Sequence, residues 1–166
     1  MGNRVLILFG TETGNAEYCA ERLADAVDAM GQESVLVDMG DYAATDLPNE
    51  SLVFIVTSTH GQGDAPGNAM KLLDSLKKNE IDLTGVRYAV CGLGDTSFTY
   101  FAQCGKDFDA ILEKRGATRV INRVDCDEDY DPEFAEFNDQ VVAYLEDEDA
   151  RRQALASGAV SSTATA

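Results

Sequence analysis

The 166-residue sequence has few basic residues and no long apolar run. Its 13 Lys and Arg stand against 30 Asp and Glu, a formal net charge of −17, so binding to the phosphates of nucleic acid is disfavoured. No apolar run reaches the roughly 18 residues that a membrane-spanning helix needs, and the first residues lack the features of a signal peptide. We therefore expect a cytoplasmic protein without a membrane segment.

Histidine and cysteine are scarce as well. The one histidine, His60, excludes a metal centre built from several histidines. The cysteines form no CxxC pair and no zinc-ligand spacing, and a chain of this length forms a core without disulfides, so we interpret them as reduced thiols. They are Cys19, Cys91, Cys104 and Cys126.

An acidic stretch, Asp125 to Asp131, superficially resembles a calcium loop. Tyr130 stands where an EF-hand requires glycine for a sharp turn, and Pro132 follows closely. The sequence therefore predicts no metal site, and the stretch is expected to form part of a charged rim beside a binding site.

Short apolar segments alternate five times with helical patterns, which favours an α/β fold with a parallel sheet. Five such units most economically form a doubly wound five-stranded sheet in the order 2-1-3-4-5, with helices on both faces. A ligand would then bind at the carboxyl ends of strands 1, 3 and 4. The expected strands are 5–9, 34–37, 52–56, 88–91 and 120–124.

Length and the 45% hydrophobic composition suit one domain with a single core. We assign residues 1–148 to this domain. Residues 149–166 end in small residues without an apolar stripe, so they are expected to form a disordered tail or a linker.

The loop from Thr11 to Asn15, between the first expected strand and a helical pattern, has the composition of a phosphate-binding turn. A strand that turns tightly into a helix leaves backbone N–H groups pointing into one small space. Thr11 and Thr13 add hydroxyl groups, Gly14 permits a positive φ, and Asn15 is expected to cap the helix. The loop has no Lys or Arg, which distinguishes it from the GxxxxGK[ST] nucleotide loop.

Two further loops follow the third and fourth expected strands. Residues 57–64 contain two glycines and several hydroxyl groups, which would expose backbone donors and acceptors to a flat polar ring. Residues 92–98 bring glycines and Phe98, whose aromatic face suits stacking on a planar heterocycle. Together the three loops would supply one phosphate site and two walls.

With these three motifs, residues 4–146 resemble the flavodoxin family, and specifically the flavin mononucleotide (FMN) domains of diflavin reductases such as the sulfite reductase flavoprotein and NADPH-cytochrome reductase. The resemblance implies that the first loop holds the FMN phosphate and that the other two bracket the isoalloxazine ring. It places Phe98, where the family usually has Tyr, against the ring, and His60 on the opposite side. It also implies that the peptide at Gly61 reorients with the oxidation state of the flavin.

The cofactor-binding residues that the resemblance implies come from these loops and their surroundings. They are Thr11, Glu12, Thr13, Gly14, Asn15, Ala16, Ser58, Thr59, His60, Gly61, Gln62, Gly63, Leu93, Gly94, Asp95, Phe98, Tyr100, Phe101, Gln103 and Asp125.

The function expected from the resemblance is that of a monomeric electron carrier without catalytic activity of its own. It would pass single electrons from a flavin reductase to an acceptor protein, through a basic docking face on the partner that meets the acidic surface of this chain. One alternative is the FMN domain of an NADPH-dependent diflavin reductase. Another, from a different class, is a receiver-like signalling module, which shares the strand order 2-1-3-4-5. A hydrolase is poorly supported because the sequence has no GxSxG motif.

Overall fold

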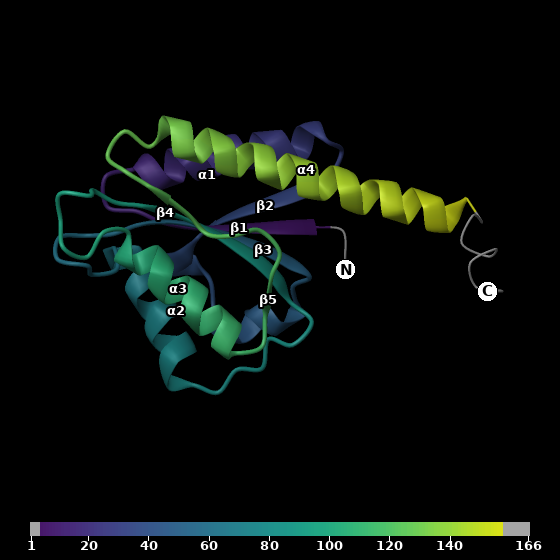
Figure 1. Ribbon diagram of the computed structural model, residues 1–166. Coiled ribbons are helices and arrows are strands. Elements are labelled where there is room, and N and C mark those ends of the chain that lie inside the picture. Colours follow the sequence, from purple (N-terminus) through teal and green to yellow (C-terminus); the bar gives the residue numbers. More distant parts are fainter. Residues whose placement is uncertain (1–3, 158–166) are drawn as a thin grey trace.

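The computed structural model describes residues 4–157, and a parallel β-sheet lies at its centre (Figure 1). The strands run in the order β2-β1-β3-β4-β5, with β6 also paired to β4, which confirms the doubly wound order expected from the sequence. β1, β3 and β4 are buried along nearly their whole length, because helices cover both faces of the sheet. The four long strands are β1 (Arg4–Gly10), β2 (Glu33–Asp38), β3 (Leu52–Ser58) and β4 (Arg87–Leu93).

The fifth position of the sheet differs from the expected strand at 120–124. Two short segments, β5 (Thr118–Arg119) and β6 (Val124–Cys126), pair with opposite ends of β4. In a continuous strand the Cα atoms of residues 119 and 123 would lie about 13 Å apart. Where the strand is interrupted, the side chains of Arg119 and Arg123 both donate to the carboxylate of Asp109.

Two helices cover each face of the sheet (Figure 1). On one face, Phe54 of β3 meets Phe137 of α4 edge to face, with ring centroids 6.2 Å apart. Gly31 and Gly116 follow the ends of α1 and α3 with φ of 81° and 104°, as expected for residues that stop a helix. The helices are α1 (Asn15–Ala29) and α4 (Asp131–Ala156) on this face, and α2 (Gly67–Lys78) and α3 (Gln103–Lys114) on the other.

Two short 3-10 turns connect β2 to β3. They are η1 (Met39–Asp41) and η2 (Ala44–Asn49). Met39 and Leu47 are buried in the core on the α2 and α3 side, so this polar connection is anchored by single apolar side chains.

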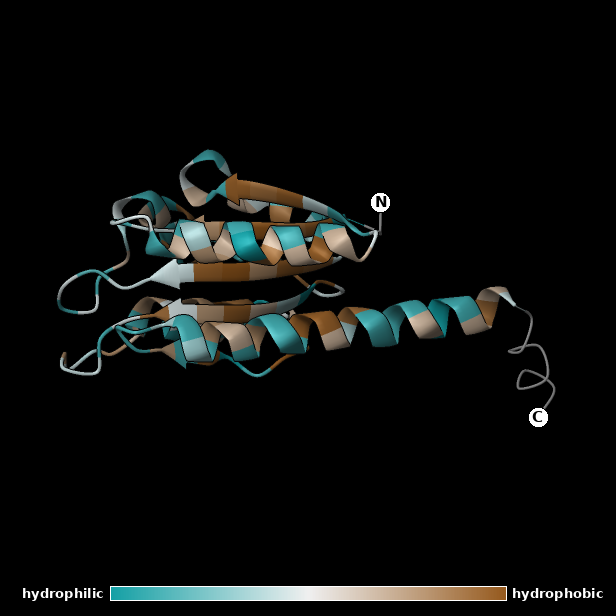
Figure 2. Cartoon of the chain, turned by 90° about the horizontal axis from the view of Figure 1, so that it is seen from above, coloured by the Kyte–Doolittle hydropathy of each residue, from teal (hydrophilic) through white to brown (hydrophobic). Residues whose placement is uncertain are grey.

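The last helix extends past residue 148, where the sequence analysis placed the end of the domain. α4 continues to Ala156 and projects beyond the sheet (Figure 2). Side-chain pairs one helical turn apart, Arg152 with Glu148 and Gln153 with Asp149, support this exposed part. Residues 149–156 of the expected tail are therefore helical, and residues 158–166 lie outside the described part of the chain.

The four cysteines are buried free thiols, as the sequence indicated. The Sγ atoms of Cys91 and Cys126 lie 3.6 Å apart on neighbouring strands. Burial raises the pKa of the Cys19 thiol to about 12 and that of the Cys104 thiol to about 12.

These raised values predict a loss of stability in alkali. A thiol in the unfolded chain ionises near pH 8.5, at roughly its reference pKa, whereas the buried thiols stay protonated to about pH 12. The unfolded state therefore binds fewer protons between these values, and the free energy of unfolding falls as the pH rises through this window. Urea denaturation at pH 7, 9 and 10.5 measures the effect, and Cys19→Ala with Cys104→Ala should reduce the slope. A flat profile above pH 9 would contradict the prediction.

Among residues 4–157 no helix is long and apolar enough to cross a membrane. The same residues contain no cluster of three or more His, Cys, Asp or Glu side chains able to hold a metal ion.

Candidate functional site

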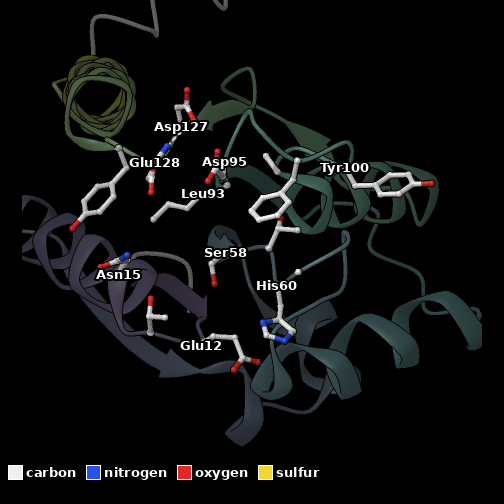
Figure 3. A pocket seen from close by; sticks show the side chains of 16 residues that line it. Glu12, Asn15, Ser58, His60, Leu93, Asp95, Tyr100, Asp127 and Glu128 are labelled. Carbon is white, nitrogen blue, oxygen red and sulfur yellow. Dashed lines mark hydrogen bonds between the residues drawn. The ribbon is translucent and has the colours of Figure 1, made fainter.

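The loops after β1, β3 and β4 meet at the carboxyl ends of the strands around a cavity of about 210 Å³ (Figure 3). This is the edge at which ligands bind in doubly wound sheets. The loop after β6 closes one side of the cavity. The lining residues are Glu12, Thr13, Asn15, Ser58, Thr59, His60, Gly61, Leu93, Gly94, Asp95, Phe98, Tyr100, Ala102, Asp127, Glu128 and Tyr130.

The loop after β1 presents free backbone donors to the cavity. Gly14 precedes α1 with a φ of 95°, and its N–H donates to Thr11 Oγ1 at 2.9 Å. The expectation that Asn15 caps the helix is wrong: Asn15 is the first helical residue, and no side chain caps this end. Within the described residues no group accepts from the backbone N–H of Thr13, Asn15 or Ala16, because the first turn of a helix has no internal partners.

A phosphate group fits this loop. Free N–H groups and the positive end of the α1 dipole attract an anion. A Cβ at Gly14 would meet no atom within 4 Å, so the space beside these donors is open. The loop therefore has the chemistry and the room for a phosphoryl group.

The loop after β3 is a tight hairpin. The His60 N–H donates to the Asp64 carbonyl at 2.7 Å, and the Asp64 N–H donates back at 2.9 Å. Gly61 and Gly63 at its tip have φ of 52° and 101°. A Cβ at Gly63 would lie 2.7 Å from Tyr100 Cβ, so only glycine lets this hairpin pack against the neighbouring loop. The His60 side chain stands at the margin of the cavity (Figure 3).

The loop after β4 carries the aromatic wall. Phe98 lines the cavity with 47% of its surface exposed, although a large apolar side chain is normally buried. Ala102, a non-glycine residue, has a φ of 52°, and a Cβ at Gly94 would lie 2.6 Å from its nitrogen. Such strain in a sparsely populated region is typical of functional sites. The loop therefore offers an exposed ring held on a tightly constrained backbone.

Asp127 joins this loop to the one after β6. Its carboxylate accepts from the Thr96 N–H at 2.9 Å and from the Thr96 hydroxyl at 2.7 Å. These bonds, the backbone one first, hold the pKa of the Asp127 carboxyl below its usual value. Asp127 is therefore ionised at neutral pH and fixes one loop to the other.

The cavity has a negative rim. Glu12, Asp95, Asp127 and Glu128 line it, and none of the lining residues within the described chain is Lys or Arg. Of the carboxylates in the acidic stretch that was expected at the rim, Asp127 and Glu128 line the cavity, and the other three do not. Asp64 lies in a neighbouring groove that also contains Glu12 and His60.

Eight of the expected cofactor residues do not line this cavity. Ala16 is fully buried in the core, Gln103 donates to Asp107, and the Asp125 carboxylate is paired with Arg123 at 2.9 Å. Tyr100 does line the cavity, but its ring points away from it (Figure 3). The eight are Thr11, Gly14, Ala16, Gln62, Gly63, Phe101, Gln103 and Asp125.

Four lining residues, Ala102, Asp127, Glu128 and Tyr130, were not among the expected cofactor-binding residues, although the last three belong to the acidic stretch that was expected beside the site. Tyr130 lies within the acidic stretch and directly precedes α4, so its place at the carboxyl end of the fifth sheet position was the signal that could have located it. Ala102 carries no sequence signal, because a left-handed φ is uncommon for alanine.

The fold and this cavity define an α/β electron-transfer module with a flavin site. The family model of flavodoxin matches residues 7–138, and the chain belongs to the flavodoxin family. The chain binds FMN, and the cavity fits this cofactor: the free N–H groups suit the phosphate, and the exposed Phe98 suits the ring. The match is to a different family from the receiver modules, which removes that alternative.

Relatives and solved structures agree with this assignment. The chain is 44% identical over 145 residues to the sulfite reductase [NADPH] flavoprotein alpha-component of Vibrio vulnificus, covering 87% of this chain and 24% of that protein. The corresponding protein of Aliivibrio fischeri is 43% identical over 159 residues, covering 95% and 25%. The chain therefore spans about a quarter of the length of these relatives. Oxidised Flavodoxin 2 from Bacillus cereus superposes with a TM-score of 0.75 at 27% identity, covering 87% of this chain and 99% of that one.

Proposed function

We propose that this chain carries electrons one at a time from a flavin reductase to an acceptor protein, and that it does so in the cytoplasm as a monomer. The proposal rests on one observation. Backbone N–H groups without acceptors, the exposed Phe98 ring and His60 line the same cavity at the carboxyl edge of the sheet. Bound FMN supplies reversible one- and two-electron chemistry.

The residues of the chain would bind and tune the cofactor. The N–H groups of Thr13 and Asn15 would hold the phosphate, and Phe98 and His60 would flank the ring. Because Gly61 has a φ of 52° and a Cβ there would meet no atom within 4 Å, the peptide at the hairpin tip is free to reorient.

A second candidate is the FMN domain of an NADPH-dependent diflavin reductase. The identity of 44% to a sulfite reductase [NADPH] flavoprotein favours it, because that relative is named for an NADPH-dependent activity. In this case the donor would be a reductase domain of the same assembly. The two candidates share the FMN site. In the first the electron donor is a separate flavin reductase, and in the second it is a reductase domain of the same assembly.

Reduction kinetics test the proposed function. The FMN-loaded chain should remain oxidised with NADPH alone and become reduced once a flavin reductase, such as the reductase part of a sulfite reductase flavoprotein, is added. A basic acceptor such as cytochrome c should then be reduced at a rate that falls with salt, because the acidic rim attracts it. Failure of the loaded chain to exchange electrons with any donor would contradict the proposal.

Replacing Phe98 by alanine should weaken FMN binding by about tenfold, because stacking on an exposed aromatic ring contributes about 1–2 kcal/mol. Fluorescence titration of the apoprotein with FMN measures the change. Tyr100→Ala is the matched control, since the Tyr100 ring points away from the cavity and alanine retains the Cβ beside Gly63. Equal losses in the two variants would argue against Phe98 as the stacking wall.

The acidic rim should lower the potential at which the second electron is added, because each carboxylate opposes the accumulation of negative charge at the ring. Potentiometric titration should give a second potential below that of free FMN. Glu128→Gln should raise it, since Glu128 lines the cavity and is exposed. A second potential equal to that of free FMN would refute this effect.

A further inference from the structure

Asn68, the second residue of α2, connects three parts of the chain outside the cavity lining. Its Oδ1 accepts from the Thr11 N–H at 2.9 Å. Its Nδ2 donates to Asp38 Oδ1 at 3.0 Å and to the Phe9 carbonyl at 3.4 Å. The amide thus ties the end of β1 to the end of β2 and to the first residue of the phosphate loop.

The contact reaches the free donors of that loop through one further bond. Thr11, whose N–H is held by Asn68, accepts from the Gly14 N–H at 2.9 Å through its own hydroxyl oxygen. Gly14 is the residue whose positive φ turns the chain into α1. Asn68 is therefore two hydrogen bonds away from the N–H groups of Thr13 and Asn15.

The same end of α2 also holds Glu12. The Gly67 N–H donates to Glu12 Oε2 at 2.7 Å, which places this carboxylate at the positive end of the α2 dipole. The phosphate loop has no Lys or Arg, so the direction of its N–H groups and the position of its one carboxylate decide how well it binds an anion. Both depend on the first two residues of α2.

We propose that Asn68 is a positioning residue that sets the shape of the phosphate loop and thereby the preference of this chain for FMN over riboflavin. The proposal rests on the FMN site described above. Asn68 touches neither the cavity nor the ring walls, so it acts on the phosphate side alone. Riboflavin has the ring without the phosphate, so its affinity measures the contacts to the ring alone.

Two substitutions distinguish the contribution of the acceptor oxygen Oδ1 of Asn68 from that of its donor nitrogen Nδ2. Asn68→Leu removes both and should reduce FMN affinity by about tenfold, the loss expected when hydrogen bonds that orient the phosphate-binding N–H groups are removed. Riboflavin affinity should change by less than about twofold. Asn68→Asp keeps an acceptor for Thr11 but sets a second carboxylate against Asp38. Its FMN affinity should also fall, because like charges repel across this contact.

A double variant restores the pair with exchanged roles. In Asn68→Asp with Asp38→Asn, the new amide at position 38 can donate to the new carboxylate at position 68. FMN affinity should rise above that of Asn68→Asp because the two carboxylates no longer repel each other. It should stay below that of the parent chain, because the same Asp38 oxygen also accepts from the Gly40 N–H and the new carboxylate faces the Phe9 carbonyl. Asn79→Asp, the same change at the far end of α2, is the matched control and should leave both affinities unchanged.

The experiment titrates each apoprotein with FMN and with riboflavin and follows amide hydrogen exchange at residues 11–16. A selective loss of FMN affinity, faster exchange in this loop and partial recovery in the double variant would support the proposal. Equal losses for both ligands, or unchanged FMN affinity in Asn68→Leu, would overturn it. A parent chain that binds both flavins but exchanges electrons with no donor would contradict only the proposed function.

Discussion

Replacing Asp109 by alanine should lower the free energy of unfolding by about 3 kcal/mol, because a buried carboxylate with several charged partners is lost. Asp109 is 5% exposed, and its carboxylate accepts from the Tyr88 hydroxyl at 2.8 Å, from Arg119 at 2.8 Å and from Arg123 at 2.7 Å. The side chains of Arg119 and Arg123 are each 28% exposed, so water can partly solvate their charges after the change, and the lower end of the range for buried pairs applies. Urea denaturation at pH 7 measures the loss.

Asp107 on the same helix offers a matched control. Its side chain is 30% exposed and lies 4.0 Å from Lys77, so Asp107→Ala should cost less than about 1 kcal/mol. Asp109→Asn, which keeps the shape and an acceptor oxygen, should lose less than Asp109→Ala. Similar losses for Asp107→Ala and Asp109→Ala would show that this carboxylate does not organise the fifth sheet position.

Replacing Gly14 by valine should reduce FMN affinity by about 100-fold, because a β-branched residue is strained by about 1–3 kcal/mol at this backbone conformation. The φ of Gly14 is 95°, and a Cβ there meets no atom within 4 Å. The loss of FMN affinity therefore comes from backbone strain and not from a side chain that fills the phosphate site. Relief of the strain would turn the neighbouring N–H groups away from the phosphate. Titration with FMN measures the change.

Gly31 separates loss of binding from loss of stability. It lies at the opposite end of α1 with a φ of 81°, and a Cβ there also meets no atom within 4 Å. Gly31→Val should therefore reduce the free energy of unfolding about as much as Gly14→Val but leave FMN affinity unchanged. If both variants lost FMN affinity equally, the loop at Gly14 would have no direct part in binding.

Asn15 and the fifth strand show where local patterns mislead. Asn15 has a side chain that favours a cap, yet the Thr11 hydroxyl takes the Gly14 N–H and Asn15 becomes helical. Residues 120–124 have the composition of a strand, yet the interruption between β5 and β6 lets Arg119 and Arg123 reach Asp109. At Asn15 a competing hydrogen bond between residues three positions apart accompanies the loss of the cap, whereas at the fifth strand a contact that depends on the folded chain outweighs a local propensity.

The apolar periodicities were sufficient for the sheet order, because strand length and helix spacing are properties of short segments. The family followed from the resemblance of the three loop motifs, which are also short segments. The folded chain alone revealed the hydrogen bonds of Asn68, the left-handed φ of Ala102 and the hydrogen bonds between Asp127 and Thr96. Asn68 is 57 positions from Thr11, and a hydrogen bond over that separation leaves no periodic or compositional mark. Such contacts come into existence only when packing of the helices against the sheet brings distant segments within 3 Å of each other.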